Sequence, residues 1–344
     1  MTDLPPQPQQ PRDDARAALE EALYEMKRII VGQDAMLERV LVALLTGGHV
    51  LLEGVPGLAK TLTVRTLAQV LGGSFSRVQF TPDLVPADLV GTRIYRPDTG
   101  RFDIELGPVM GNFLLADEIN RAPAKVQSAL LEVMQERQVT IGGQSFPAPA
   151  PFLVLATQNP IESEGTYPLP EAQLDRFLMK LVVDYPSRGE EAAVVGRSLG
   201  APADVRERIS LAELETYSEA TRSVMVDRDV MEYAVSLADA TRNPGDYELE
   251  ELAQYIEYGA SPRGPIGLVQ SARALALLRG RGHATIDDVR DLAADVLRHR
   301  LVMSYDALGD GVTADDVLQR VLDAVDEPDG GRRSRPRSRS SDAA

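Results

Sequence analysis

The sequence contains no cysteine, and its histidines are limited to His49, His283 and His299. The absence of cysteine excludes disulfide bonds, a cysteine nucleophile and thiolate metal sites, and it agrees with a reducing compartment. None of the histidines stands at helical or hairpin spacing from another. This spacing argues against a histidine-based metal centre.

Long apolar runs are also absent. The longest, "VLVALL" and "FLVLA", are far shorter than a bilayer span, and the N-terminus lacks a basic segment followed by an apolar one. We therefore expect a cytoplasmic protein with no membrane insertion. A chain of 344 residues, 44% of them hydrophobic, can bury a large core, and its length indicates two domains or one large domain with a satellite.

Acidic residues outnumber basic ones, and lysine is scarce. The net charge is −16, the pI is near 4.7, and lysine occurs only at Lys27, Lys60, Lys125 and Lys180. This balance works against a nucleic-acid motor, because such proteins gain affinity by releasing counterions with clustered Lys and Arg. A local basic channel remains compatible with the composition.

The two ends of the chain differ in composition from the rest. Residues 1–13 are rich in Pro and Gln and are predicted to form a disordered lead. Residues 327–344 are predicted to form a disordered basic tail, either a solvated terminus or a docking segment for an acidic partner.

Between these ends, residues 14–187 alternate short apolar runs with helical patterns, which predicts an α/β domain with a parallel sheet and crossover helices. Residues 188–326 carry no strand signal and predict a smaller all-helical domain with capping boxes at 285–288 and 313–316. The expected strands cover 49–54, 77–81, 112–117, 152–158 and 177–185, and the expected helices cover 14–30, 34–46, 61–71 and 123–136.

The stretch "LLEGVPGLAKT" (51–61) has the order strand, glycine loop, Lys-Thr, helix. Such a loop directs backbone N–H groups toward phosphate oxygens at the positive end of a helix dipole. In this arrangement Lys60 contacts the β and γ phosphates, and Thr61 places its hydroxyl on Mg²⁺. The usual glycine before the lysine is Ala59 here, so the motif alone is incomplete.

Two further apolar strands end in polar residues. "NFLLADEIN" ends in Asp117 and Glu118, which at the carboxyl edge of a sheet could hold Mg²⁺ and deprotonate an attacking water. An acidic helix N-terminus is the alternative. "FLVLATQNP" ends in Gln158 and Asn159, whose amides could bind that water and the γ-phosphate, or could simply form a turn.

Five segments together resemble the MoxR family of AAA+ ATPases. They are "GVPGLAKT", "LLADEINRAPAKVQSALLEVMQERQVTIGG", "ATQNP", "LPEAQLDRF" and "GASPRG", in that order, and the similarity covers roughly residues 20–305. The resemblance implies a P-loop NTPase (AAA+) fold, a parallel sheet core flanked by helices plus a helical lid. It also implies hydrolysis of ATP with Mg²⁺.

The resemblance implies roles for individual residues. Asp117 and Glu118 match the Walker B pair, with Asp117 and Thr61 as metal ligands, and Asn159 matches the first sensor. The Walker A loop and the box near the adenine supply the residues expected to bind ATP: Val31, Gly32, Gln33, Gly54, Val55, Pro56, Gly57, Leu58, Ala59, Lys60, Thr61 and Leu62.

Two arginines complete the catalytic set implied by the family. Arg176 in "LDRF" matches the arginine finger offered to the neighbouring subunit, and Arg263 in "SPRG" matches the second sensor, carried by the lid of the same subunit. From the residues alone, Arg176 could instead pair with acidic residues. Arg263 stands at a helix start, where a cation gains nothing from the dipole, and this favours a ligand role. Arg121 is a further intersubunit candidate.

Two segments are predicted to form insertions. "VTIGGQSF" (139–146) has β-prone arms around Gly142-Gly143, a hairpin turn. Residues 80–108 interrupt the second strand-to-helix crossover with turns of their own. Both resemble the hairpin insertions of the helix-two-insert clade, which line the face or pore of the ring; ordinary surface loops are the alternative.

We therefore predict an ATPase that forms a homo-oligomeric ring, a hexamer, and remodels or matures partner proteins in a chaperone-like manner. The resemblance implies clients with a von Willebrand factor A domain. The alternatives are the ATPase subunit of a metal chelatase-type complex, a nucleotide-controlled scaffold with little turnover, and a nucleic-acid motor.

Overall fold

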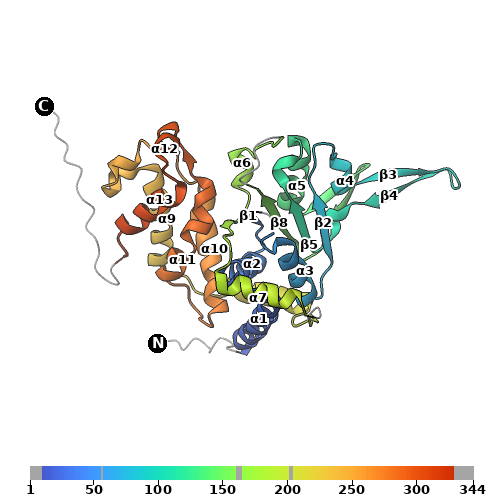
Figure 1. The fold of residues 1–344 in the computed structure, drawn as a ribbon, viewed down its shortest axis with the longest axis horizontal. Helices are drawn as coiled ribbons and strands as arrows, with labels where there is room; N and C mark the ends of the chain where they lie inside the picture. The colour runs from blue at the N-terminus through green and yellow to red at the C-terminus, as the bar shows by residue number, and fades with distance from the viewer. Residues whose placement is uncertain (1–9, 56, 160–164, 201–203, 329–344) are drawn as a thin grey trace, which may run out of the picture.

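The computed structural model describes residues 10–55, 57–159, 165–200 and 204–328. Its parts are an α/β body, a helical lid beside it and a long hairpin that projects from the opposite side of the body (Figure 1). No helix in the part of the chain that the structure describes has the length and apolar character needed to span a bilayer.

The body is built on a five-stranded parallel sheet in the order β2-β5-β8-β1-β9. Its strands are β1 (Val50–Glu53), β2 (Phe75–Gln79), β5 (Phe113–Asp117), β8 (Leu153–Gln158) and β9 (Met179–Val182). The central strands are buried along almost their whole length, because helices cover both faces of the sheet. All five expected strands are present, which confirms the predicted parallel sheet.

The last strand is shorter than expected. The sequence predicts a strand over 177–185, whereas β9 covers only Met179–Val182. Before it, the amide of Phe177 donates to Leu174 in a turn. Beyond it, Tyr185 is exposed and a proline follows, so the apolar run leaves the sheet before it ends.

The helices of the body follow the predicted pattern closely. They are α1 (Gln10–Ile29), α2 (Asp34–Thr46), α3 (Lys60–Val70) and α5 (Ala124–Glu136). The disordered lead predicted for 1–13 is too long, because α1 already begins at Gln10; residues 1–9 lie outside the described residues. Of the predicted tail, residues 329–344 also lie outside them.

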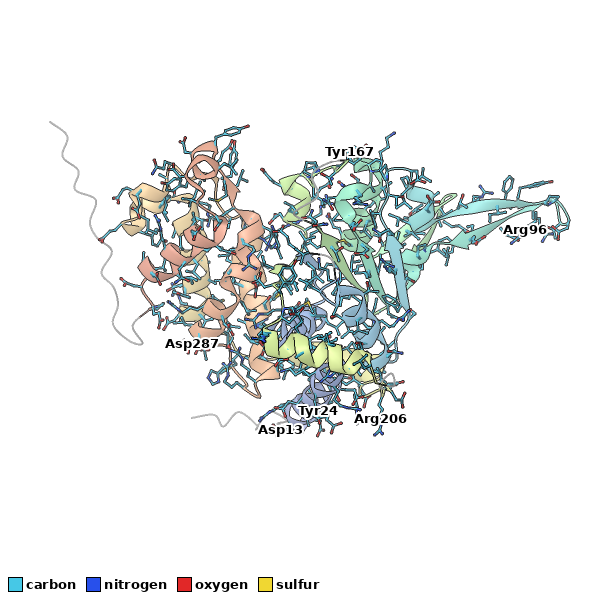
Figure 2. The ribbon with its side chains drawn as sticks, viewed as in Figure 1. Asp13, Tyr24, Arg96, Tyr167, Arg206 and Asp287 are labelled. Carbon is cyan, nitrogen blue, oxygen red and sulfur yellow. The ribbon has the colours of Figure 1, made fainter. Side chains whose placement is uncertain are left out.

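Both predicted insertions are hairpins. The first follows the short helix α4 (Pro86–Val90) and consists of β3 (Gly91–Arg96) and β4 (Arg101–Leu106). It extends far from the body, with Arg96 near its tip (Figures 1 and 2). The second pairs β6 (Gln138–Ile141) with β7 (Gln144–Pro147) around Gly142 and Gly143, as predicted.

The lid is mainly helical. Thr285 and Thr313 cap their helices reciprocally with Asp288 and Asp316, which confirms both capping boxes. One feature differs from the prediction of an all-helical region: the short strands β10 (Ile256–Tyr258) and β11 (Val302–Met303) pair antiparallel. The helices after β9 are α7 (Arg188–Ser198), α8 (Leu211–Arg222), α9 (Arg228–Arg242), α10 (Arg263–Leu278), α11 (Ile286–Leu297), α12 (Tyr305–Asp310) and α13 (Ala314–Ala324).

Body and lid share a hydrophobic core. One continuous cluster of buried side chains runs from β1 and α3 through α1 and α2 into α10 and α11. A second cluster fills the other face of the sheet, under α5 and the hairpin β6-β7. Since α2 contacts lid helices α8 and α10 directly, the domain limits 14–187 and 188–326 stay a prediction.

The histidine just before β1, His49, is buried and makes the stability of the fold depend on pH. The Val154 amide donates to Nδ1 of His49 at 3.0 Å, so Nε2 carries the proton and donates to the Met134 carbonyl at 3.2 Å. Burial lowers the pKa of His49 to about 3. Burial also lowers the pKa of His299 well below its ordinary value.

We expect the free energy of unfolding to fall as the pH drops below 6.5. In this range the unfolded chain takes up protons on these histidines, whereas the folded chain does not until the pH approaches the depressed values. The slope contributed by each histidine approaches about 1.4 kcal/mol per pH unit. Urea denaturation at pH 7, 6 and 5 measures it.

The matched control is Val154→Ala, beside His49. This variant should lower stability by the same amount at each pH, whereas His49→Gln should flatten the pH dependence. An unchanged slope in His49→Gln would contradict the assignment.

Candidate functional site

The loop between β1 and α3 approaches other backbone closely. A Cβ on Gly54 would lie 2.5 Å from the carbonyl oxygen of Val183, so only glycine fits there without a shift. Gly57 has φ +90, which a residue with a side chain rarely adopts. The loop therefore needs glycine at both predicted positions. Pro56, between them, lies outside the described residues.

Ala59 occupies the position at which the motif usually has glycine. It adopts the left-handed conformation, φ +56 and ψ 15, and precedes the first residue of α3. Holding an L-residue there costs roughly 1–2 kcal/mol. Among the described residues, no side chain caps this helix start, so its first backbone N–H groups remain available to an anion.

Lys60 is the first residue of α3, and its ammonium folds back over the loop. It donates to the carbonyl of Gly54, and the residue is half-buried. Burial lowers the pKa of Lys60, while the nearby carboxylates of Asp117 and Glu118 oppose that shift. The lysine and the two carboxylates therefore act on one another electrostatically.

Asp117 ends β5 between two neighbouring strands. From β2, Arg77 donates to its Oδ2 at 2.7 and 3.2 Å. From β8, the Thr157 hydroxyl donates to its Oδ1 at 2.6 Å. The carboxylate is mostly shielded from solvent and is held by a cation and a hydroxyl.

Glu118 has an unusual backbone, with φ +56 and ψ 51. Its amide donates to the Thr157 hydroxyl at 2.8 Å. Its carboxylate accepts from the amide of Gln79 at 2.8 Å and pairs with Arg121 at 3.0 Å. Strained backbone of this kind is concentrated at functional sites, and here the surrounding bonds hold it.

These groups surround one cavity of about 450 Å³ at the carboxyl edge of the sheet. Most of the predicted residues line it, and so do three polar residues that the sequence analysis missed: Arg77, Gln79 and Thr157. Their position as polar side chains within predicted strands was the sequence signal that could have identified them as candidates for the site. The full lining is Gly54, Gly57, Leu58, Ala59, Lys60, Thr61, Leu62, Arg77, Gln79, Asp117, Glu118, Thr157, Gln158 and Asn159.

Four predicted nucleotide contacts lie elsewhere. Val55 packs against the core. The segment Val31 to Gln33 links α1 to α2, and the amide of Gln33 donates to the Asp184 carbonyl at 3.2 Å. A Cβ on Gly32 would meet the carboxylate of Glu190. None of these four lines the 450 Å³ cavity.

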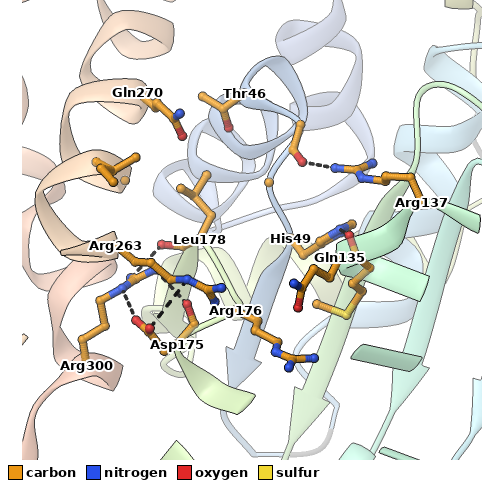
Figure 3. Close-up of a pocket in the computed structure, with 15 residues that line it drawn as sticks. Thr46, His49, Gln135, Arg137, Asp175, Arg176, Leu178, Arg263, Gln270 and Arg300 are labelled. Carbon is orange, nitrogen blue, oxygen red and sulfur yellow. Dashed lines mark hydrogen bonds and ion pairs between the residues drawn. The ribbon is translucent and has the colours of Figure 1, made fainter. Parts of the chain in front are cut away.

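Arg176 and Arg263 lie in a second cavity, of about 310 Å³, which Arg137 and Arg300 also line (Figure 3). Arg176 precedes β9, and the residue before β1, His49, lines the same cavity. In a parallel sheet these positions lie at the amino edge, opposite the carboxyl ends at which Lys60 and Asp117 stand. A four-residue strand separates the two edges by about 13 Å.

The structure does not place Arg263 near Lys60 of the same chain, where the prediction that it serves the nucleotide of its own subunit would need it. The start of α10 is anchored on the body at the amino edge of the sheet: the Ser261 hydroxyl lies 3.0 Å from both Asp175 carboxylate oxygens, and Arg263 lies 3.9 Å from one of them. The lid thus packs beside the sheet and does not bring Arg263 to the 450 Å³ cavity.

A glycine loop, an N-terminal helix lysine and a carboxylate pair at one sheet edge define a P-loop ATPase of the AAA class. A family model described as "ATPase family associated with various cellular activities (AAA)" matches residues 49–179, and one described as "AAA lid domain" matches 250–321. "Chaperone MoxR1" of Mycobacterium tuberculosis is 56% identical over 310 residues, which are 90% of this chain and 82% of that protein. The chain belongs to the MoxR family of chaperone-like AAA+ ATPases, nucleotide-binding enzymes that hydrolyse ATP.

Two further comparisons agree. "Protein MoxR" of Methylorubrum extorquens is 31% identical over 334 residues, covering 92% of this chain and 96% of that protein. A solved structure from Cytophaga hutchinsonii, described as that of a candidate ATPase, has a TM-score of 0.88 and 45% identity over 92% of this chain and 97% of that one. The family and the fold predicted from the sequence are thus confirmed.

Proposed function

We propose that this ATPase forms a closed hexameric ring, in which each ATP site is completed by the adjacent subunit, and that hydrolysis remodels or matures a partner protein. The observation that carries the proposal is the separation of the site into two cavities at opposite edges of one sheet. Lys60, Asp117 and Glu118 line one, and Arg176 and Arg263 line the other. A ring of identical subunits brings the second edge of one chain to the first edge of the next.

The residues of the 450 Å³ cavity fit ATP with Mg²⁺. The uncapped start of α3 and the Lys60 ammonium offer donors and positive charge to phosphate oxygens. The Thr61 hydroxyl and the Asp117 carboxylate are hard oxygen ligands, and Asp117 already holds a cation, the Arg77 guanidinium. When bound, Mg²⁺ would neutralise charge on the phosphates.

Side chains of the protein carry out the other steps of ATP hydrolysis. Glu118 accepts the proton of the attacking water, and Asn159 orients that water against the γ-phosphate. Arg176 of the adjacent subunit stabilises the charge that develops on the transferring phosphoryl group. Since Arg263 shares the cavity of Arg176, we assign it to the same neighbouring site. Val31, Gly32 and Gln33 stay proposed contacts for the adenine.

The partner protein is proposed from the family and from the hairpins. The relative named as a chaperone supports a remodelling role, and the family resemblance points to clients with a von Willebrand factor A domain. The hairpin β3-β4 exposes Tyr95 and Phe102, whose rings lie 5.2 Å apart, on an arm that reaches beyond the body (Figure 1). This arm is the proposed contact for the client.

The proposal predicts that hydrolysis per subunit rises with protein concentration. A dissociated chain lacks the neighbouring arginine, and loss of such a residue lowers turnover by about 10³-fold or more. Steady-state ATPase rates across the assembly range, with sedimentation at the same concentrations, measure the effect. A rate per subunit that stays flat while the oligomer dissociates would contradict a shared site.

A further inference from the structure

The segment that carries Arg176 is held by the lid. Arg300, at the end of η5 (Arg298–Arg300), is only 3% exposed at its side chain. Its guanidinium donates to the Asp175 carboxylate at 2.9 Å and to the backbone carbonyls of Phe177 at 2.8 Å and Leu178 at 3.2 Å. The residues on both sides of Arg176 are therefore bound to one lid side chain.

A second lid contact converges on the same carboxylate. The Ser261 hydroxyl, just before α10, lies 3.0 Å from each oxygen of Asp175. In Figure 3, Arg263 and Arg300 point to Asp175, whereas Arg176 extends away from it into the cavity. Arg176 itself is exposed. The guanidinium of Arg176 is thus exposed, while the residues on both sides of Arg176 are held by the lid.

The hydrogen-bond and ion-pair partners that the structure describes for Arg300 all lie in its own chain. A buried guanidinium is tolerated only where its donors are satisfied, and its described partners are the Asp175 carboxylate, carbonyls of the clamped segment and of Val296, and the His299 ring. Burial lowers the pKa of Arg300 to about 10, so it still carries its charge at neutral pH. Its role is to hold backbone in place.

We propose that Arg300 is a positioning residue for Arg176, so that the lid of one subunit sets the arginine that completes the ATP site of the next. This inference rests on the proposed function of Arg176. A movement of the lid would shift the clamped segment with it, and a catalytic group displaced by about 1 Å can lose on the order of 10² in rate. Lid orientation and hydrolysis at the adjacent site are thereby coupled.

A double-mutant cycle on the full-length protein tests the proposal. Arg300→Gln should lower kcat by about 10²-fold and leave ATP affinity within about twofold, because Arg300 does not line the 450 Å³ cavity. In an Arg176→Ala background the same substitution should cause no further loss of kcat, since its target is gone. Losses that multiply, or an unchanged kcat in Arg300→Gln alone, would overturn the proposal.

Two other variants serve as a control and as a replacement should Arg300→Gln not fold. Arg298→Gln is the matched control: Arg298 is a partly buried arginine of the same η5, but it bonds to Asp295, Asp315 and the Lys180 carbonyl, so kcat should not change. If Arg300→Gln does not fold, Ser261→Ala removes the lighter contact; its smaller loss of kcat should likewise vanish in Arg176→Ala. A wild-type kcat in Ser261→Ala, or a loss of kcat that persists in the Arg176→Ala background, would then overturn the proposal.

The cycle also separates this inference from the proposed function. If Arg176→Ala alone leaves turnover unchanged, the shared site is wrong and the positioning role is lost with it. If Arg176→Ala abolishes turnover and the effect of Arg300→Gln is independent of it, only the positioning role is overturned.

Discussion

Replacing Glu118 by glutamine is expected to remove ATP turnover while leaving ATP bound. Loss of a general base lowers the rate by about 10²–10⁴-fold. Glutamine retains the shape of the side chain, and its carbonyl oxygen can still accept from Gln79, so the cavity and its phosphate-binding loop stay intact. ATPase rates and equilibrium binding of labelled ATP, measured on the same preparation, test the two halves of the prediction.

The matched control is Glu132→Gln, which removes an exposed carboxylate from α5, away from the cavity. It should leave both rate and binding unchanged. A wild-type rate in Glu118→Gln would favour the alternative of a nucleotide-controlled scaffold, because a scaffold does not depend on proton removal.

Replacing Arg176 by alanine is expected to lower kcat by about 10³–10⁵-fold, the effect of losing an arginine finger. ATP affinity should change little, because Arg176 does not line the cavity that contains Lys60. Titration of ATP against rate separates kcat from KM, and sedimentation shows whether the ring persists.

Arg228→Ala is the control for this variant, since Arg228 is a strongly exposed arginine that pairs only with Glu232 among the described contacts. It should behave as wild type. A raised KM with an unchanged kcat in Arg176→Ala would mean that the arginine only helps to bind the nucleotide and does not stabilise the transferring phosphoryl group.

Most of the residues that line the 450 Å³ cavity could be predicted, because the sequence patterns that indicate them are local. The order of strand, glycine loop and lysine places the loop at the start of a helix, and the strand that ends at Asp117 places the carboxylates at the same edge. Lys60 and Asp117 do line one cavity, as this reasoning requires. The hairpin turn at Gly142 and Gly143 is equally local, because a two-residue glycine turn sets the register of its arms.

The polar side chains around the carboxylates could not be assigned in this way. Gln79 is paired with Asp117 in the register of β2 and β5, and Thr157 reaches Asp117 from β8. These contacts depend on the strand order, which joins strands far apart in the sequence. A polar residue within a strand indicates a candidate, but it does not reveal its neighbour.

By itself, the sequence predicted the glycine loop before α3, the carboxyl ends of β5 and β8, the capping boxes and the family, because each follows from short-range order along the chain. Only the tertiary structure decided that Arg263 lies at the sheet edge opposite Lys60, and that Arg300 holds the residues on both sides of Arg176. Those positions depend on which edge of the sheet the lid packs against, and this is set by a core shared between body and lid that no local pattern contains.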